Sequence, residues 1–260
     1  MKPDLSVTGK RVLVTAGAGG IGRVIAETFA DAGAQVHVCD VDEVALKALA
    51  RARPAISTSA CDVSDPAQVE ALFGDVKRIL GGLDVLVNNA GVAGPTGRVE
   101  DIAFEDWRRC LAVNLDGMFL CTHLAMPMIK AAGGGSIINL SSSAGRLGFP
   151  LRSPYAAAKW GVVGYTASLA IEAGPDQVRV NCIQPGIVEG DRIDRVAAAK
   201  AGALGIAVED QKRRMVQAVS MRTMVTAQDI ANTALFLASD AGQHISGQAI
   251  PVCGNLETLA

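Results

Sequence analysis

Tyr155 and Lys159 stand four residues apart in a predicted helix, a spacing that permits acid–base chemistry. Residues at that separation project from one face of a helix, so the phenol and the ammonium group can be neighbours. A free phenol has a pKa of about 10 and is a poor base near neutrality, but an adjacent cation lowers that pKa. Ser142 adds a hydroxyl that can hold a substrate oxygen. The three residues predict proton transfer at that oxygen.

A glycine-rich turn follows the first predicted strand and opens the first predicted helix. Glycines there permit a tight turn and close backbone approach to a pyrophosphate, whose charge meets the helix N-terminus. Asp40 ends the next predicted strand, 20 residues after Gly20, at the spacing of a carboxylate that holds a ribose 2′-hydroxyl. A 2′-phosphate would be repelled there, so the sequence favours NAD over NADP. The turn residues expected to bind are Gly17, Gly19, Gly20, Ile21 and Gly22. The alternatives are an ordinary strand-to-helix loop and a solvated Asp40.

The elements that must position these residues alternate between short β-branched runs and longer Ala-rich helical patterns. This alternation predicts a doubly wound α/β fold, a parallel sheet with helices on both faces, in one domain over 1–260. Every candidate motif follows a predicted strand, where such sheets bind ligands. We predict strands over 11–15, 35–40, 55–61, 83–87, 136–141, 177–183 and 248–252. We predict helices over 20–32, 41–52, 65–80, 104–132 with a kink at Pro127, 153–173 and 226–238.

Composition argues against several other classes of protein. A net charge of -2 offers no electrostatic case for nucleic acid or an anionic membrane. The start lacks the features of a signal peptide, and we expect no apolar run of about 18 residues that would span a membrane. Six cysteines without paired spacing indicate buried free thiols in a reducing cytoplasm rather than a zinc or disulfide site. We expect no metal, and we expect His37 to be packed in a strand.

Further motifs follow the later strands. Asn88-Asn89-Ala90-Gly91 follows the fourth, Asn114 lies in Val113-Asn114-Leu115, and Pro185-Gly186-Ile187-Val188 follows the sixth. With the glycine turn and the Ser-Tyr-Lys set, they make the chain resemble the short-chain dehydrogenase/reductase family over essentially its whole length. The chain departs from the family pattern in three places. Ala16 replaces the first glycine of the turn, Gly190 replaces a frequent threonine, and Cys253-Gly254-Asn255 replaces Asp-Gly-Gly.

The resemblance implies a role for each matching residue. Tyr155 is the general acid/base, and Ser142, 13 residues before it, holds the carbinol oxygen in preference to Ser141 or Ser143. Lys159 binds ribose and lowers the tyrosine pKa, and Asn114 keeps a water in the proton relay. The resemblance also places Asp62 and Val63 at adenine, Asn89, Ala90 and Gly91 along the cofactor, and Pro185, Gly186 and Val188 at the nicotinamide amide.

The expected activity is hydride transfer between NAD and a secondary alcohol or ketone. An NADPH-dependent 3-oxoacyl-thioester reductase and a nucleotide-binding protein without catalysis are the alternatives. The family also implies a homotetramer. We expect 189–220 to form a mobile substrate lid broken near 201–205, the alternative being a rigid surface excursion. The lid cations are either a basic cover for an acidic substrate or, as we favour, a solvated helix face: Arg192, Arg195, Lys200, Lys212, Arg213 and Arg214.

Overall fold

The computed structural model describes residues 5–259, which contain a single seven-stranded sheet whose strands are all parallel. The strand order is β3-β2-β1-β4-β5-β6-β7, so the chain reverses its direction of travel across the sheet between β1 and β4. Ligands of such sheets bind at this switch point, beyond the carboxyl ends of the strands. The strands are β1 Arg11–Thr15, β2 Gln35–Asp40, β3 Ser57–Ala60, β4 Val85–Asn88, β5 Gly135–Leu140, β6 Val178–Pro185 and β7 Ala249–Val252.

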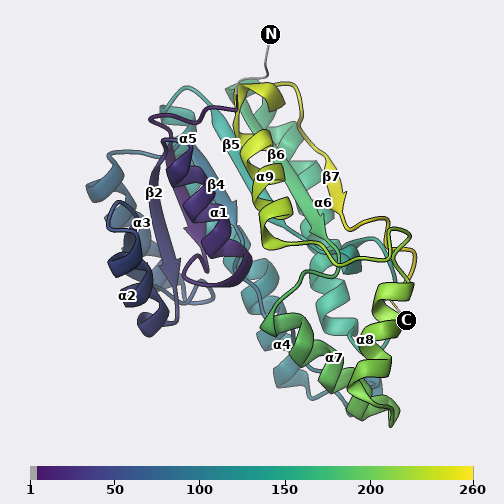
Figure 1. Cartoon of the computed structure of the whole chain (residues 1–260). Helices are drawn as coiled ribbons and strands as arrows, with labels where there is room; N and C mark the ends of the chain where they lie inside the picture. Colours follow the sequence, from purple (N-terminus) through teal and green to yellow (C-terminus); the bar gives the residue numbers. More distant parts are fainter. Residues whose placement is uncertain (1–4, 260) are drawn as a thin grey trace.

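Helices cover both faces of the sheet, which confirms the predicted doubly wound α/β fold (Figure 1). Helices α1, α2 and α9 pack on one face and helices α3, α5 and α6 on the other. Helices α7 and α8 lie beyond the carboxyl ends of the strands, at the same end as α4 (Figure 1). The helices are α1 Gly20–Asp31, α2 Glu43–Ala52, α3 Pro66–Leu80, α4 Phe104–Leu111, α5 Gly117–Ala131, α6 Ser153–Ala173, α7 Asp191–Leu204, α8 Val208–Gln217 and α9 Ala227–Ala238.

Alternation along the strands builds the two halves of the core. In β1, Val12 and Val14 pack against α1 and α9, whereas Leu13 between them packs against α3 and α5. All three side chains are fully buried. A strand covered on both faces must be apolar at successive positions, which explains the continuous run of valine and leucine.

The segment predicted as one long helix is divided into three pieces. Helix α4 ends at Leu111, a single π-helical turn, η2 (Ala112–Asp116), follows, and α5 resumes at Gly117. Pro127 lies inside α5. The departure from α geometry is therefore at Asn114, one of the predicted site residues. Single π turns within α-helices are frequent at functional sites.

By length and composition alone, the run Phe104–Ala131 is apolar enough to cross a membrane, contrary to our expectation of no such run. In the fold, α5 packs against α3, β4 and β5, and 44% of the apolar window is buried. A core helix of an α/β protein is apolar because a sheet covers one of its sides and neighbouring helices cover another.

His37 and the cysteines are buried, as predicted. His37 is fully buried in β2, where its two ring nitrogens bond to the hydroxyls of Ser57 (2.8 Å) and Ser59 (3.1 Å). Burial lowers the pKa of His37 to about 4, so the ring is neutral at pH 7. The six cysteines are buried and free.

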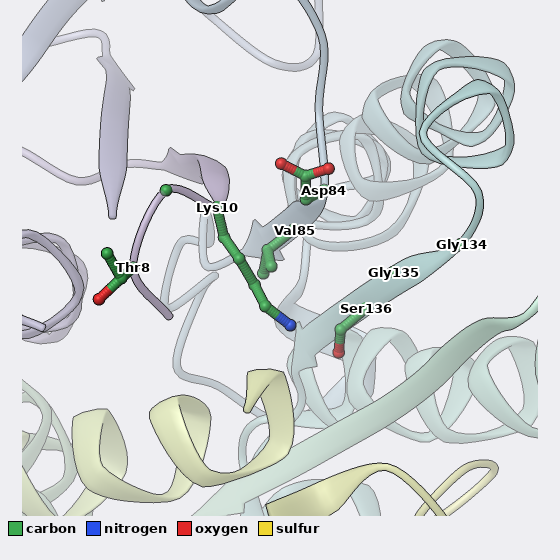
Figure 2. Close-up of a pocket in the computed structure, with 8 residues that line it drawn as sticks. Thr8, Lys10, Asp84, Val85, Gly134, Gly135 and Ser136 are labelled. Carbon is green, nitrogen blue, oxygen red and sulfur yellow. The ribbon is translucent and has the colours of Figure 1, made fainter. Parts of the chain in front are cut away.

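A hollow lies at the amino ends of the strands, opposite to the predicted site (Figure 2). Lys10 extends across it toward Ser136, and Asp84 and Gly135 border it. The Lys10 ammonium donates to the carbonyl oxygen of Ala238 at 3.2 Å. None of the predicted site residues lines this hollow, and we assign it no part in the chemistry.

Candidate active site

Tyr155 and Lys159 lie in the first two turns of α6, directly beyond β5. The Lys159 ammonium is 5.6 Å from the centroid of the Tyr155 ring and donates to the carbonyl oxygen of Leu140 at 2.8 Å. Lys159 is only 3% exposed, so its position is fixed by this hydrogen bond and by the surrounding helix. The i, i+4 spacing therefore does bring the phenol and the ammonium group together, as predicted.

The surroundings of Tyr155 favour its ionised form. Burial opposes ionisation, but Arg192, Lys159, a hydrogen bond with Ser142, and Arg152 together outweigh it and lower the pKa of the phenol. Burial and Arg192 also lower the pKa of Lys159, whereas Tyr155 acts in the opposite direction. A tyrosine pKa below its usual range is what base catalysis near neutrality requires.

Three consecutive serines follow β5, and their hydroxyls differ in their partners. Ser141 donates to the carbonyl oxygen of Lys159 at 2.8 Å, and Ser143 donates to that of Pro185 at 3.1 Å. Both residues are buried. The Ser142 hydroxyl accepts from the N–H of Ala144 at 3.1 Å and also bonds to the Tyr155 phenol.

Asn114 lies in the π turn η2 and is 1% exposed. Its amide nitrogen donates to the carbonyl oxygens of Cys110 (2.8 Å) and Val92 (3.0 Å). Its amide oxygen is buried and has no partner within the described chain. A Cβ on Gly91 would lie 2.7 Å from that oxygen and 3.5 Å from the Lys159 ammonium, so both groups face the same small space. A water there can bridge them.

The glycine turn fits a dinucleotide. A Cβ on Gly22 would lie 2.3 Å from the carbonyl oxygen of Ala16, so only glycine permits this contact between helix and turn. A Cβ on Gly19 or Gly20 would meet no heavy atom within 4 Å, so there is open space above the N-terminus of α1. Exposed backbone N–H groups at a helix N-terminus suit a pyrophosphate. Ile21 follows in the first turn of α1.

Ala16 adopts a left-handed conformation, with φ of 49°. This conformation costs a non-glycine residue about 1–2 kcal/mol. Asn89 holds the turn in place, since its amide nitrogen donates to the carbonyl oxygens of Thr15 and Ala16 at 3.0 Å each. The N–H of Ala90 donates to the Thr15 hydroxyl at 3.0 Å. Asn89 and Ala90 thus connect the end of β4 to the turn.

Asp40 reaches the glycine turn from the end of β2. One carboxylate oxygen accepts from the N–H of Ala18 and the other from the N–H of Asp42, each at 3.1 Å. Asp40 is partly exposed, so the carboxylate keeps lone pairs available to a ligand above the turn. Its negative charge lies where the sequence predicts the ribose.

Asp62 and Val63 follow β3. The Asp62 carboxylate accepts from Ser64 and pairs with Arg109 at 3.1 Å, whereas its backbone N–H donates to Gln68. Burial opposes ionisation of Asp62, but the bonds from Ser64 and Arg109 outweigh it and lower its pKa. Val63 is 5% exposed and packs against Gly117. Both residues lie at the same end of the sheet as the turn.

Pro185, Gly186 and Val188 leave the end of β6. A Cβ on Gly186 would lie 2.6 Å from that of Cys253, and the N–H of Gly186 donates to Val252 at 2.9 Å. The segment is therefore held against the residues after β7. Val188 forms a parallel bridge with Val225.

Two of the departures from the family pattern have local explanations. Gly190 adopts φ of 125° at the N-cap of α7, a conformation essentially restricted to glycine, so threonine could not occupy this backbone. Cys253 is buried, and its sulfur accepts from a guanidinium N–H of Arg146 at 3.2 Å and from the N–H of Leu256 at 3.4 Å.

The predicted lid contains α7 and α8. Helix α7 continues through Leu204, so only Gly205 of the expected break at 201–205 lies outside a helix, and residues 205–207 join α7 to α8. The six cations of the lid divide into two groups. Lys212 pairs with Asp194 and Arg213 pairs with Asp210, whereas Arg195 and Arg214 are exposed, so these four cations belong to a solvated face. The other two, Arg192 and Lys200, lie beside the rings of Tyr155 and Phe149.

Arg152 is a site residue that sequence reasoning missed. It is the N-cap of α6, follows Leu151 at φ of 64°, and is 2% exposed. Its guanidinium carbon lies 5.3 Å from the ring centroid of Phe149 and 5.4 Å from that of Tyr155. The sequence does indicate this position, because Arg152 stands three residues before Tyr155 at the start of a helix, and residues at that spacing lie on one face of the helix.

The residues around the Tyr155 ring are not equally placed to meet a ligand. Phe149 is partly exposed, and its ring lies edge-on to Tyr155 at 6.4 Å between centroids. Ala93 contributes its carbonyl oxygen to Arg152. Ser143 and Ala144, by contrast, are buried behind the site. Residues 5–259 contain no group of three or more His, Cys, Asp or Glu side chains that could hold a metal ion.

Known proteins resemble this chain in sequence and in fold. The family model described as enoyl-(acyl carrier protein) reductase matches residues 15–255. An uncharacterized short-chain type dehydrogenase/reductase of Sinorhizobium fredii is 35% identical over 257 residues, 95% of this chain and 97% of that protein. Sorbitol dehydrogenase of Cereibacter sphaeroides is 34% identical over 252 residues, 96% of this chain and 98% of that protein. The crystal structure of NAD+-bound xylitol dehydrogenase matches with a TM-score of 0.92 and 28% identity, covering 95% of this chain and 99% of that one.

Proposed function

The chain belongs to the short-chain dehydrogenase/reductase family of NAD(P)-dependent oxidoreductases, and from this premise we propose that it transfers a hydride between NAD(H) and a secondary alcohol or ketone. The observation that carries the proposal is the position of Tyr155. Its phenol lies beside the Lys159 ammonium and the Ser142 hydroxyl, and its pKa is lowered. The sorbitol and xylitol dehydrogenases among the similar proteins support a secondary alcohol as substrate.

Each polar residue of the site has a task in this reaction. In the direction of oxidation, the Tyr155 phenolate accepts the carbinol proton while the Ser142 hydroxyl donates to the same oxygen. Lys159 keeps the phenol acidic and offers its remaining N–H groups to ribose hydroxyls. The unpartnered amide oxygen of Asn114 holds a water that passes the proton from Lys159 toward solvent. When bound, the nicotinamide supplies the hydride acceptor.

We assign cofactor binding to the residues around the switch point of the sheet. Gly17, Gly19, Gly20, Ile21 and Gly22 receive the pyrophosphate, and Asp40 accepts from the ribose 2′-hydroxyl. Asp62 and Val63 border the adenine, and Asn89, Ala90 and Gly91 line the middle of the groove. Pro185, Gly186 and Val188 meet the nicotinamide amide. The charge of Asp40 supports NAD over NADP, because a 2′-phosphate would bring like charges together.

An NADPH-dependent 3-oxoacyl-thioester reductase is the second candidate, and the acyl-carrier-protein description of the matching family model supports it. Asp40 opposes it, as does the glycine turn, which contains no lysine or arginine. We also propose a single domain, a mobile lid at 189–220, a homotetramer and a cytoplasmic location. The six buried free thiols support a reducing compartment.

The test is turnover of NAD with a panel of polyols, secondary alcohols, hydroxy acids and steroids, followed by NADH absorbance. Tyr155→Phe should lower kcat by about 10²–10⁴-fold or more, the range of general acid/base catalysis, with NADH affinity almost unchanged. Tyr165→Phe is the matched control, since Tyr165 is the second of the two tyrosines and lies on the same helix. If Tyr155→Phe retained most of its activity, the proposed mechanism would be wrong.

A further inference from the structure

Besides Lys159, three cations lie beside the ring of Phe149 and the ring of Tyr155, the proposed catalytic residue. The guanidinium carbon of Arg152 lies 5.3–5.4 Å from the ring centroids of Phe149 and Tyr155. The Lys200 ammonium is 4.7 Å from the Phe149 centroid, and the guanidinium carbon of Arg192 is 6.0 Å from the Tyr155 centroid. The cations come from the start of α6 and from α7, so they converge on the space between the two elements.

No carboxylate neutralises this cluster within residues 5–259. None of the ion pairs there includes Arg152, Arg192 or Lys200, although other lid cations are paired with aspartates. Arg152 and Arg192 act on each other as like charges, as do Arg152 and Lys200. Several cations held close together without an anion repel one another and destabilise the fold, and a bound anion would remove this repulsion.

Two of the three cations are buried with donors left over. Arg152 is 2% exposed, its guanidinium makes one hydrogen bond, to the carbonyl oxygen of Ala93, and its buried Nε–H has no partner in the described chain. Lys200 is 3% exposed and, among residues 5–259, makes one hydrogen bond, to the carbonyl oxygen of Leu259 at 2.9 Å. Buried arginine and lysine are normally paired. An unpartnered N–H on a buried guanidinium therefore points to an acceptor supplied by a ligand.

We propose that Arg152, assisted by Lys200 and Arg192, binds the carboxylate of the substrate, and that this enzyme therefore oxidises a short hydroxy acid or reduces the matching oxo acid. The inference rests on the proposed hydride transfer and adds the class of substrate. The carboxylate binds the cations and does not react. At the carbinol, the O–H proton passes to the Tyr155 phenolate, the C–H bond breaks with its electron pair leaving as hydride to oxidised NAD, and a C=O bond forms.

The lid contributes to the same charge recognition. Arg192 donates to the carbonyl oxygen of Gly91 at 3.3 Å, so α7 is held across the groove next to the place of the substrate. An anion between Arg152 and Lys200 would attract α6 and α7 to each other. A neutral alcohol would leave the repulsion between these cations in place. The cluster thus favours an acidic substrate and disfavours a neutral one of the same shape.

The experiment compares hydroxy acids of increasing chain length with their neutral primary amides, which have nearly the same shape. We expect kcat/KM for the best acid to exceed that for its amide by about 10- to 100-fold, as a charge-assisted hydrogen bond would provide. Arg152→Gln and Lys200→Met should each reduce this ratio toward one, and Arg152→Lys should recover part of it. Lys212→Met, which removes an exposed lid cation paired with Asp194, should leave the ratio unchanged.

Binding separates this inference from the proposed function. Calorimetry of the same acids and amides with the NADH-loaded protein measures recognition without turnover. If neutral alcohols are oxidised and acids are neither preferred nor bound more tightly, the carboxylate site is wrong and the hydride transfer stands. If nothing in the panel is oxidised but acids bind through Arg152, the site stands and the proposed reaction fails. A ratio that survives in both Arg152→Gln and Lys200→Met overturns the inference.

Discussion

The carboxylate of Asp40 accepts a hydrogen bond from the backbone N–H of Ala18 at 3.1 Å, which joins the end of β2 to the middle of the glycine turn. A negative charge is thereby fixed at one position beside the groove. The contact also aligns the turn with the strand that follows α1. Cofactor choice and turn geometry consequently depend on the same side chain.

We predict that the protein prefers NAD to NADP. Asp40→Ala should lower the ratio of kcat/KM with NAD to kcat/KM with NADP by about 10-fold or more, which is the range of a hydrogen bond to a charged group. Measuring kcat/KM with both cofactors tests this. Asp42→Ala is the control, because Asp42 is two residues away but caps α2 through the N–H groups of Val44 and Ala45. An NADP preference in the unmodified protein would contradict the assignment.

We predict that the rate of alcohol oxidation rises with pH and levels off above the pKa of Tyr155, since only the phenolate accepts the proton. Arg192 is the cation that most favours the phenolate. Arg192→Met should therefore raise the Tyr155 pKa and move the rising limb to higher pH. Arg195→Met removes an exposed cation of the same helix and should not move it. Superimposable pH profiles for all three proteins would exclude this role of Arg192.

We predict that His37 weakens the fold in acid. Its folded pKa is about 4 against about 6.5 when unfolded, so below pH 6.5 the unfolded chain binds more protons. The free energy of unfolding then falls as the pH drops from 6.5 through 4, by about 3 kcal/mol at most. Denaturant titrations at several pH values should show a smaller acid loss for His37→Gln. The exposed His123→Gln should keep the full loss.

We predict that α7 and α8 gain protection from amide hydrogen exchange when NAD and substrate bind together. The segment is attached to the body through a few contacts, among them Arg192 with Gly91 and Lys200 with Leu259, so its local opening should cost little. Helix α9, which packs on the sheet through buried Ile230 and Leu237, is the internal reference. Equal protection across 191–219 with and without ligands would favour a rigid surface excursion.

We predict a homotetramer in solution, with α5 and α6 at a contact between subunits. Phe119 is 50% exposed on α5 and Trp160 is 51% exposed on α6, and a hollow lined by Leu115, Met118 and Tyr165 lies between these helices. Light scattering should give four times the mass of one chain. Phe119→Glu with Trp160→Glu should reduce it, whereas Val44→Glu on α2 should not. A monomer at micromolar concentration would refute the prediction.

The sequence was sufficient for the sheet, because its strands and helices depend on local patterns, and it identified residues that the fold brings to one end of that sheet. The helix over 153–173 and the strands over 11–15 and 35–40 have the predicted bounds, since apolar periodicity and flanking turn residues mark them. The π turn at Asn114 was not predicted, because the residue types in Ala112–Asp116 do not distinguish a wide turn from a continuous α-helix. Arg152 was missed because its burial depends on packing between Phe149 and α7, and α7 is distant from Arg152 in the sequence.

The π turn at Ala112–Asp116 makes the number of residues in this helical run matter as well as their identities. Each residue of an α-helix advances about 100° around the axis. If one residue were deleted between Leu111 and Asn114, the chain could close into one continuous α-helix with less distortion than it now has. A π turn holds one residue more than an α turn, so removing that residue would leave α4 and α5 nearly in their present phase, and the shift would fall on the residues of the wide turn, Asn114 among them. A deletion that regularises the backbone would thus preserve the core and misalign the proton relay.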